Sequence, residues 1–125
     1  MIIGVGVDSI EIGRVARAVG RNSRLRSRLF TPSELAQVPR GPKAPSRMAA
    51  LFAAKEATLK ALGTGLRGHS WQQVEVLHRE SGDPYVVLYG QALETAGRLG
   101  ITSIHISLSH DRERAVAFCI AEGEE

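Results

Sequence analysis

The strongest chemical signal in the chain is a group of charged residues just before a glycine-rich turn. Glu56 and Lys60 are four residues apart, so in a helix they share one face, and Lys55 lies beside them. The turn Gly63-Thr64-Gly65 follows directly. Carboxylate oxygens suit a magnesium ion, and ammonium groups with the backbone N–H groups of such a turn suit phosphate. Together they indicate a site for a diphosphate and its metal, although a surface ion pair worth about 0.3–0.5 kcal/mol beside an ordinary turn explains the same residues.

Two other places put polar side chains at the ends of apolar strands. Asp8 follows the apolar stretch 2–7, where a buried carboxylate without a partner would be costly. It either caps the next helix or has a functional role. His110 ends the run Ser107-Leu108-Ser109-His110-Asp111, and a solvated turn residue is its commoner role. A Ser–His–Asp relay is not expected, because neighbours this close in sequence do not readily adopt the relay geometry.

Strands and helices alternate irregularly and must position these residues. The helix predicted over 46–62 has no Gly or Pro, and its many alanines indicate close packing against another element. The capping pattern Thr31-Pro32-Ser33-Glu34 starts a shorter helix. The other predicted elements are a strand over 2–10, a helix from 11 to about 20, a loop over 39–45, a hairpin over 71–89, a helix over 90–100 and strands over 103–109 and 115–121. Hairpins without steady crossovers favour an α+β fold with a mainly antiparallel sheet.

Length and composition restrict the class of protein. The 125 residues suit one domain spanning 1–125 and are too few for two ordinary ones. No apolar run is long enough to cross a bilayer, and the start lacks the features of a signal peptide. The single cysteine, Cys119, excludes an intramolecular disulfide and a cysteine-built metal site. A cytoplasmic location is therefore expected.

A dense run of arginines follows the first strand. No acid occurs between Glu11 and Glu34, and the intervening stretch carries six arginines: Arg14, Arg17, Arg21, Arg24, Arg26 and Arg28. Such a patch predicts a polyanionic partner, namely nucleic acid, an acidic protein or a membrane surface. Aromatic residues make up only 5% of the chain and none lies among these arginines, so stacking on single-stranded nucleic acid is poorly supported.

Taken in order, the motifs resemble the holo-acyl-carrier-protein synthase family, the small type of phosphopantetheinyl transferase. The resemblance spans essentially the whole chain. It rests on Gly4-Val5-Gly6-Val7-Asp8-Ser9-Ile10-Glu11-Ile12 with Arg14, on Phe52-Ala53-Ala54-Lys55-Glu56-Ala57 with Lys60-Ala61-Leu62-Gly63-Thr64-Gly65, and on Ser107-Leu108-Ser109-His110-Asp111. It implies the fold of that family, an antiparallel sheet against a long central helix. It also implies transfer of 4′-phosphopantetheine from coenzyme A to a serine of apo-acyl carrier protein, for fatty acid or polyketide biosynthesis.

The resemblance also implies roles for single residues and an assembly. Asp8 and Glu56 hold magnesium, or alternatively manganese, on the coenzyme A diphosphate, and with Lys60 they form the catalytic set. The coenzyme A-binding residues are Lys55, Lys60, Gly63, Thr64, Gly65 and His110. The carrier-protein-binding residues are Arg14, Arg21, Arg24 and Arg28. The family commonly forms homotrimers with an active site at each subunit interface.

Two details of this chain stay open in the sequence. The carrier serine needs a base, and either Glu56 or a metal-bound water fits. Leu51 occupies a position where many family members have an arginine associated with the nucleotide phosphates. Our hypothesis is that Arg47, one helical turn earlier, replaces that arginine.

Three other functions compete with the transferase. A metal-dependent phosphohydrolase acting on a diphosphate would use the same carboxylates but need no carrier protein. A basic nucleic-acid-binding module would show steeply salt-dependent binding, but it gives no reason for Asp8, Glu56 and the glycine turn. A non-catalytic trimeric scaffold would tolerate Glu56→Gln. All three rank below the transferase.

Overall fold

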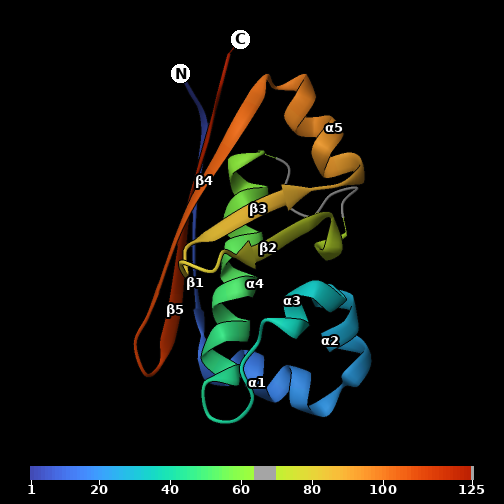
Figure 1. Cartoon of the computed structure of the whole chain (residues 1–125), viewed down its shortest axis with the longest axis vertical. Helices are drawn as coiled ribbons and strands as arrows, with labels where there is room; N and C mark the ends of the chain where they lie inside the picture. The colour runs from blue at the N-terminus through green and yellow to red at the C-terminus, as the bar shows by residue number, and fades with distance from the viewer. Residues whose placement is uncertain (64–69, 125) are drawn as a thin grey trace.

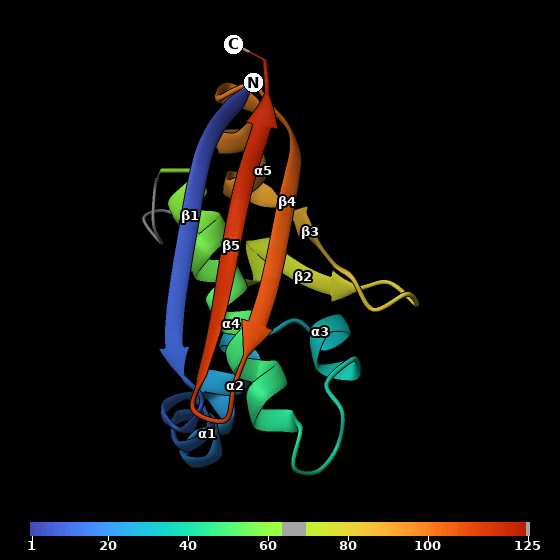
Figure 2. The same ribbon diagram turned by 90° about the vertical axis from the view of Figure 1, so that its left-hand side faces the viewer.

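A long antiparallel sheet covered on one side by a long helix forms the centre of the molecule. The computed structural model describes residues 1–63 and 70–124. The sheet has the order β1 (Ile2–Glu11), β5 (Arg114–Gly123), β4 (Ile101–His110), and both pairings are antiparallel. The helix α4 (Ala44–Ala61) lies along one face of this sheet, and no helix or strand of the described residues covers the other face (Figures 1 and 2). The predicted α+β class with a mainly antiparallel sheet is confirmed.

Small residues on both sides bring α4 and β1 unusually close together. A Cβ atom added at Gly6 would lie 1.9 Å from the carbonyl oxygen of Ala57, and one at Gly4 would lie 2.0 Å from that of Ala61. The α4 surface facing the sheet is rich in buried alanines. Every second residue of β5 also faces the helix, and these buried residues are small. The alanines of the long helix therefore pack against backbone, as their number predicted. This contact sets the spacing between α4 and the strand that carries Asp8.

Three short helices lie together at one end of α4 (Figure 1). They are α1 (Ile12–Arg21), α2 (Ser23–Leu29) and α3 (Pro32–Ala36). The separate helix α2 was not predicted; it begins at Asn22, whose side chain accepts hydrogen bonds from two backbone N–H groups. The capping box predicted for Thr31 and Glu34 is present. The helix α4 begins at Ala44, two residues earlier than predicted, because a proline is tolerated in the first turn of a helix.

A second, smaller layer packs on the other side of α4. The hairpin of β2 (Val74–His78) and β3 (Pro84–Leu88) is preceded by the 3-10 helix η1 (Trp71–Gln73) and followed by α5 (Gly90–Arg98). The predicted hairpin and helix are thus both present. Among the described residues, no helix is long and apolar enough to cross a membrane.

Candidate active site

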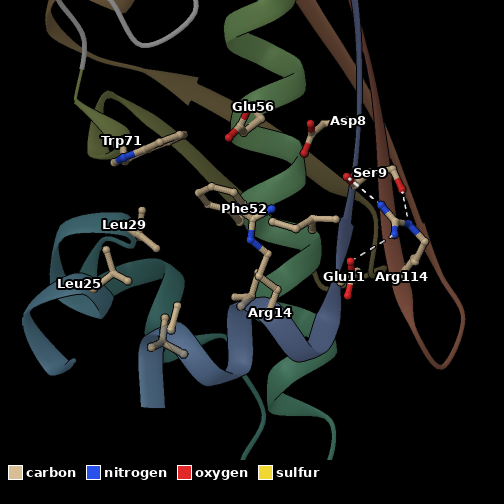
Figure 3. Close-up of a pocket in the computed structure, with 14 residues that line it drawn as sticks. Asp8, Ser9, Glu11, Arg14, Leu25, Leu29, Phe52, Glu56, Trp71 and Arg114 are labelled. Carbon is tan, nitrogen blue, oxygen red and sulfur yellow. Dashed lines mark hydrogen bonds and ion pairs between the residues drawn. The ribbon is translucent and has the colours of Figure 1, made fainter. Parts of the chain in front are cut away.

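Asp8 and Glu56 come from two different elements and line one cavity. Asp8 lies on β1 and Glu56 lies on α4, and the cavity they share has a volume of about 420 Å³ (Figure 3). On β1 the inward-facing positions alternate, so Asp8 continues the side of Gly6 that packs against the helix. The structure therefore brings together the two residues that the sequence placed on a metal.

Glu56 feels both the negative charge of Asp8 and the positive charges of Lys60 and Arg14. Burial and the neighbouring charge of Asp8 both raise the pKa of Glu56, while Lys60 and Arg14 lower it. Lys60 lies against Asp8 instead, with 3.3 Å between Nζ and Oδ1, and it also donates to the Val7 carbonyl at 2.9 Å. Two facing carboxylates that repel each other are a donor set whose repulsion a divalent cation would relieve.

These carboxylates would be only part of a metal's coordination shell. Among the described residues, no group of three or more His, Cys, Asp or Glu side chains is arranged to hold a metal ion. Magnesium is usually bound by one or two carboxylates together with substrate phosphates and water. The donor set at Asp8 and Glu56 fits that ion better than it fits a cation held by the protein alone.

Beyond the carboxylates, the cavity becomes apolar and carries a cationic rim. Its apolar lining comes from β1, α1, α2, α4 and η1, and consists of Ile10, Val15, Ala18, Val19, Leu25, Leu29, Phe52 and Trp71. Arg14 of α1 lines the same cavity beside Phe52 (Figure 3). Arg21, Arg24 and Arg28 are exposed on α1 and α2. The structure thus places Arg14 at the carboxylate site and the other three arginines on the neighbouring outer surface.

Arg47 and His110 lie in a second cavity of about 480 Å³. This cavity shares no lining residue with the first, and its basic side chains, Lys43, Arg47, His78 and His110, are accompanied by no acid. Arg47 donates to the Gln37 carbonyl at 3.1 Å, which holds it at the cavity wall. Leu51 is only 1% exposed and belongs to the core, so in this chain its position cannot contact a ligand.

Lys55 requires a correction, because the structure buries it completely. Its side chain is 0% exposed, and its ammonium group contacts Glu34 Oε1 at 2.9 Å, the Trp71 carbonyl at 3.0 Å and the Val74 carbonyl at 2.6 Å. These three acceptors use all three of its N–H donors. Lys55 is therefore removed from the residues expected to bind coenzyme A. Gly63 ends α4 with a φ of +78°, whereas Thr64 and Gly65 lie outside the described residues.

Comparison with known proteins decides the family. The model of the 4'-phosphopantetheinyl transferase superfamily matches residues 4–119. A holo-[acyl-carrier-protein] synthase of Alkaliphilus metalliredigens is 47% identical over 121 residues, which cover 97% of this chain and 99% of the relative. The chain belongs to the holo-[acyl-carrier-protein] synthases of this superfamily. The resemblance seen in the sequence is confirmed.

Solved structures of other synthases have the same fold. That of Neisseria meningitidis is 35% identical with a TM-score of 0.85, covering 98% of this chain and 99% of that one. The Helicobacter pylori synthase, solved in complex with coenzyme A, is 28% identical with a TM-score of 0.83, covering 94% of this chain and 99% of that one. The match over nearly the full length supports reading the two cavities as parts of a synthase.

The cavity also contains residues that the sequence did not single out. Phe52 was noted only as part of a motif, and Trp71 only as the start of a hairpin, yet both line the carboxylate cavity with ring centroids 5.0 Å apart. The available signal was that the chain's only tryptophan comes soon after the glycine turn. Its distance from Glu56 in sequence gave no reason to place the two together.

Proposed function

We propose that this synthase transfers the 4′-phosphopantetheine of coenzyme A to a serine of apo-acyl carrier protein with a magnesium ion at Asp8 and Glu56. The observation that carries the proposal is the pair of carboxylates on β1 and α4 facing one cavity, with Lys60 beside Asp8. The wider role is carrier activation for fatty acid biosynthesis. The buried, unpaired Cys119 agrees with a cytoplasmic location, where thiols stay reduced.

The reaction exchanges a phosphoanhydride bond of coenzyme A for a phosphodiester bond to the carrier serine. The serine oxygen attacks the β-phosphorus of coenzyme A, the bond from that phosphorus to the bridging oxygen breaks, and adenosine 3′,5′-bisphosphate leaves with this oxygen. Bound magnesium would offset the charge on the diphosphate. Asp8 and Glu56 would hold that ion, and Lys60 supplies a further positive charge beside Asp8. Glu56 is one candidate acceptor of the serine proton.

Intact-mass spectrometry of the carrier tests this function directly. Apo-acyl carrier protein is incubated with the synthase, coenzyme A and magnesium, and a chelator replaces magnesium in the control. A gain of one phosphopantetheine mass that depends on magnesium is the expected result. Cleavage of coenzyme A with no gain in carrier mass would instead show a phosphohydrolase, and equal transfer with chelator would overturn the metal proposal.

The exposed arginines of α1 and α2 make this face suited to an acidic carrier. Arg24→Glu is expected to raise the KM for the carrier about tenfold at low salt, because steering between complementary charged surfaces changes association by about 10 to 1,000-fold. The difference should shrink at high salt as the charges are screened. Arg98→Glu on α5 changes the net charge equally and should have little effect. Equal effects of both variants in steady-state kinetics would contradict a carrier site on α2.

The uncovered face of the large sheet supports a trimer with sites at its interfaces. Four apolar side chains of β1 and β5 are exposed there: Val5 at 65%, Val7 at 47%, Phe118 at 56% and Ile120 at 41%. The two cavities of one chain share no residue. In the proposed trimer, the carboxylates of one subunit and the basic cavity of a neighbour contact the same coenzyme A molecule.

Phe118→Arg tests this assembly. It is expected to yield monomers in size-exclusion chromatography with light scattering and to lose most transfer activity, because a charge would be buried in an apolar interface without a partner. Leu93→Arg on α5 is the matched control, since Leu93 is also 56% exposed but lies away from the sheet. A Phe118→Arg trimer of normal activity would exclude this face as the interface.

Arg47 is the proposed replacement for the family arginine missing at Leu51. Its position in the basic cavity predicts that Arg47→Ala raises the KM for coenzyme A by about tenfold or more, since hydrogen bonds to charged groups are worth about 1.5–3 kcal/mol. The kcat should change little. Arg40→Ala, in the exposed loop just before, serves as control. An unchanged KM in initial-rate measurements would remove Arg47 from the nucleotide site.

A further inference from the structure

Lys55 and Glu34 form an ion pair inside the protein, with 2.9 Å between Nζ and Oε1. Both side chains are 0% exposed, and burial lowers the pKa of Lys55 although Glu34 opposes that change. Replacing a buried ion pair by apolar residues of similar volume is often neutral or stabilising. A charged pair in this place is therefore explained better by the geometry that it imposes than by its contribution to folding.

That geometry is centred on η1, the short element that carries Trp71. Lys55 donates to the carbonyl oxygens of Trp71 and Val74, which lie at the two ends of the turn leading into β2. Glu34 in turn accepts the backbone N–H groups of Thr31 and Val76, at 2.8 and 2.7 Å. One buried charge pair thus ties α3, α4, η1 and β2 together.

The network continues beyond the ion pair and is fully satisfied. The Thr31 hydroxyl donates to Glu75 at 2.6 Å, and the Tyr89 hydroxyl donates to the other oxygen of Glu75 at 3.0 Å. A buried network whose members are all satisfied specifies one arrangement of the elements around it. The backbone of η1 is therefore held by contacts to both α4 and β2.

Trp71 belongs both to this network, through its carbonyl oxygen, and to the wall of the active site, through its ring. Its ring packs on Phe52 with centroids 5.0 Å apart and forms part of the wall of the cavity that contains Glu56. In Figure 3, Trp71 and Asp8 lie on opposite sides of Glu56. Lys55 and Glu56 are adjacent on α4, so the lysine that holds the Trp71 carbonyl is one residue from the carboxylate site.

We propose that Lys55, with Glu34, is a positioning residue that holds the indole of Trp71 as a wall of the active site against the incoming carrier serine. The inference rests on the proposed function, and it assigns to Lys55 a role without any contact to coenzyme A. It predicts that loss of Lys55 acts on transfer through Trp71. A misplacement of about 1 Å in such a wall can cost about a hundredfold in rate.

A double-mutant cycle between Lys55 and Trp71 tests the proposal. Lys55→Met is expected to lower kcat/KM for the carrier at least about tenfold. In a Trp71→Ala background, the same substitution should cost less than about twofold, because a residue that acts only through Trp71 has nothing left to position. The KM for coenzyme A should stay within about twofold in every variant. Equal losses in both backgrounds would overturn the proposal.

Intrinsic fluorescence gives a readout independent of activity. Trp71 is the only tryptophan of the chain, so its emission reports on this wall alone. Lys55→Met should make acrylamide quenching of this emission more efficient, whereas unchanged quenching would contradict the proposal. Thr58→Val is the matched control: Thr58 is also buried on α4, and its hydroxyl donates to the Ala54 carbonyl within the helix.

A double variant and the wild-type protein complete the test. Lys55→Met leaves Glu34 buried without a cation, so the neutral pair Glu34→Gln with Lys55→Met is measured alongside it, and all assays are run where circular dichroism shows a folded protein. If this pair gives wild-type kcat/KM and wild-type quenching, Lys55 has no positioning role. Absence of transfer by the wild-type protein itself would show instead that the proposed function is wrong.

Discussion

Glu56→Gln is expected to abolish most of the transfer activity and, at the same time, to raise the thermal stability of the metal-free protein. The activity should fall by at least about a hundredfold, which is the range for removing one group that stabilises developing charge. Asp8→Asn should reduce transfer similarly. The opposite effect on stability follows from the electrostatics of the two carboxylates when no metal is added.

Burial and the charge of Asp8 raise the pKa of Glu56 above its value in the unfolded chain. The folded protein then binds more protons at this group than the unfolded protein does, so ionisation of Glu56 lowers stability as the pH rises through the folded pKa. At neutral pH the ionised group therefore costs stability that an uncharged glutamine does not. The melting temperature of Glu56→Gln without metal should be higher than that of the wild type, and the difference should shrink toward acidic pH.

Magnesium provides the second half of this test. It should raise the melting temperature of the wild type by binding to the folded state, and it should have much less effect on Glu56→Gln. Glu94→Gln on α5 removes an exposed carboxylate of the same charge and should change neither transfer nor the response to magnesium. A Glu56→Gln protein with normal transfer would exclude this residue from the catalytic set.

The sequence predicted those parts of the fold that depend on local patterns. The capping box at Thr31, the hairpin around Gly82 and the strands over 103–109 and 115–121 each follow from patterns within a few residues. The pairing of Asp8 with Glu56 was not local, and it was predicted only through resemblance to the family. Its physical cause, the contact of Gly6 with the Ala57 backbone, becomes visible only once β1 and α4 are placed side by side.

The parts that the sequence did not predict depend on contacts between distant segments. Lys55 and Glu56 are neighbours in the sequence, yet one is fully buried and the other faces a cavity. Lys55 is neutralised by Glu34, 21 residues earlier, and no local pattern links the two. The α2 helix was missed for another reason: its seven residues are mostly arginine and serine, so no apolar periodicity marks it.

Gly6→Ala is expected to be the most destabilising single substitution discussed for this chain. A Cβ atom at this position would lie 1.9 Å from the Ala57 carbonyl oxygen and 2.9 Å from its carbon, so β1 and α4 would have to separate. Backbone atoms cannot move aside as a flexible side chain can. Overpacking in a core typically costs about 1–3 kcal/mol, and a clash with helix backbone should lie at or above the top of that range.

The same separation would reach the active site, because Asp8 is two residues from Gly6 on the same side of β1. Urea unfolding should therefore show a lower midpoint, and the surviving folded protein should transfer poorly. Gly20→Ala is the control, since an added Cβ there meets no atom within 4 Å and alanine favours a helix by about 0.5–1 kcal/mol. Wild-type stability in Gly6→Ala would mean that α4 and β1 are not in backbone contact, and the placement of Asp8 against Glu56 would lose its structural basis.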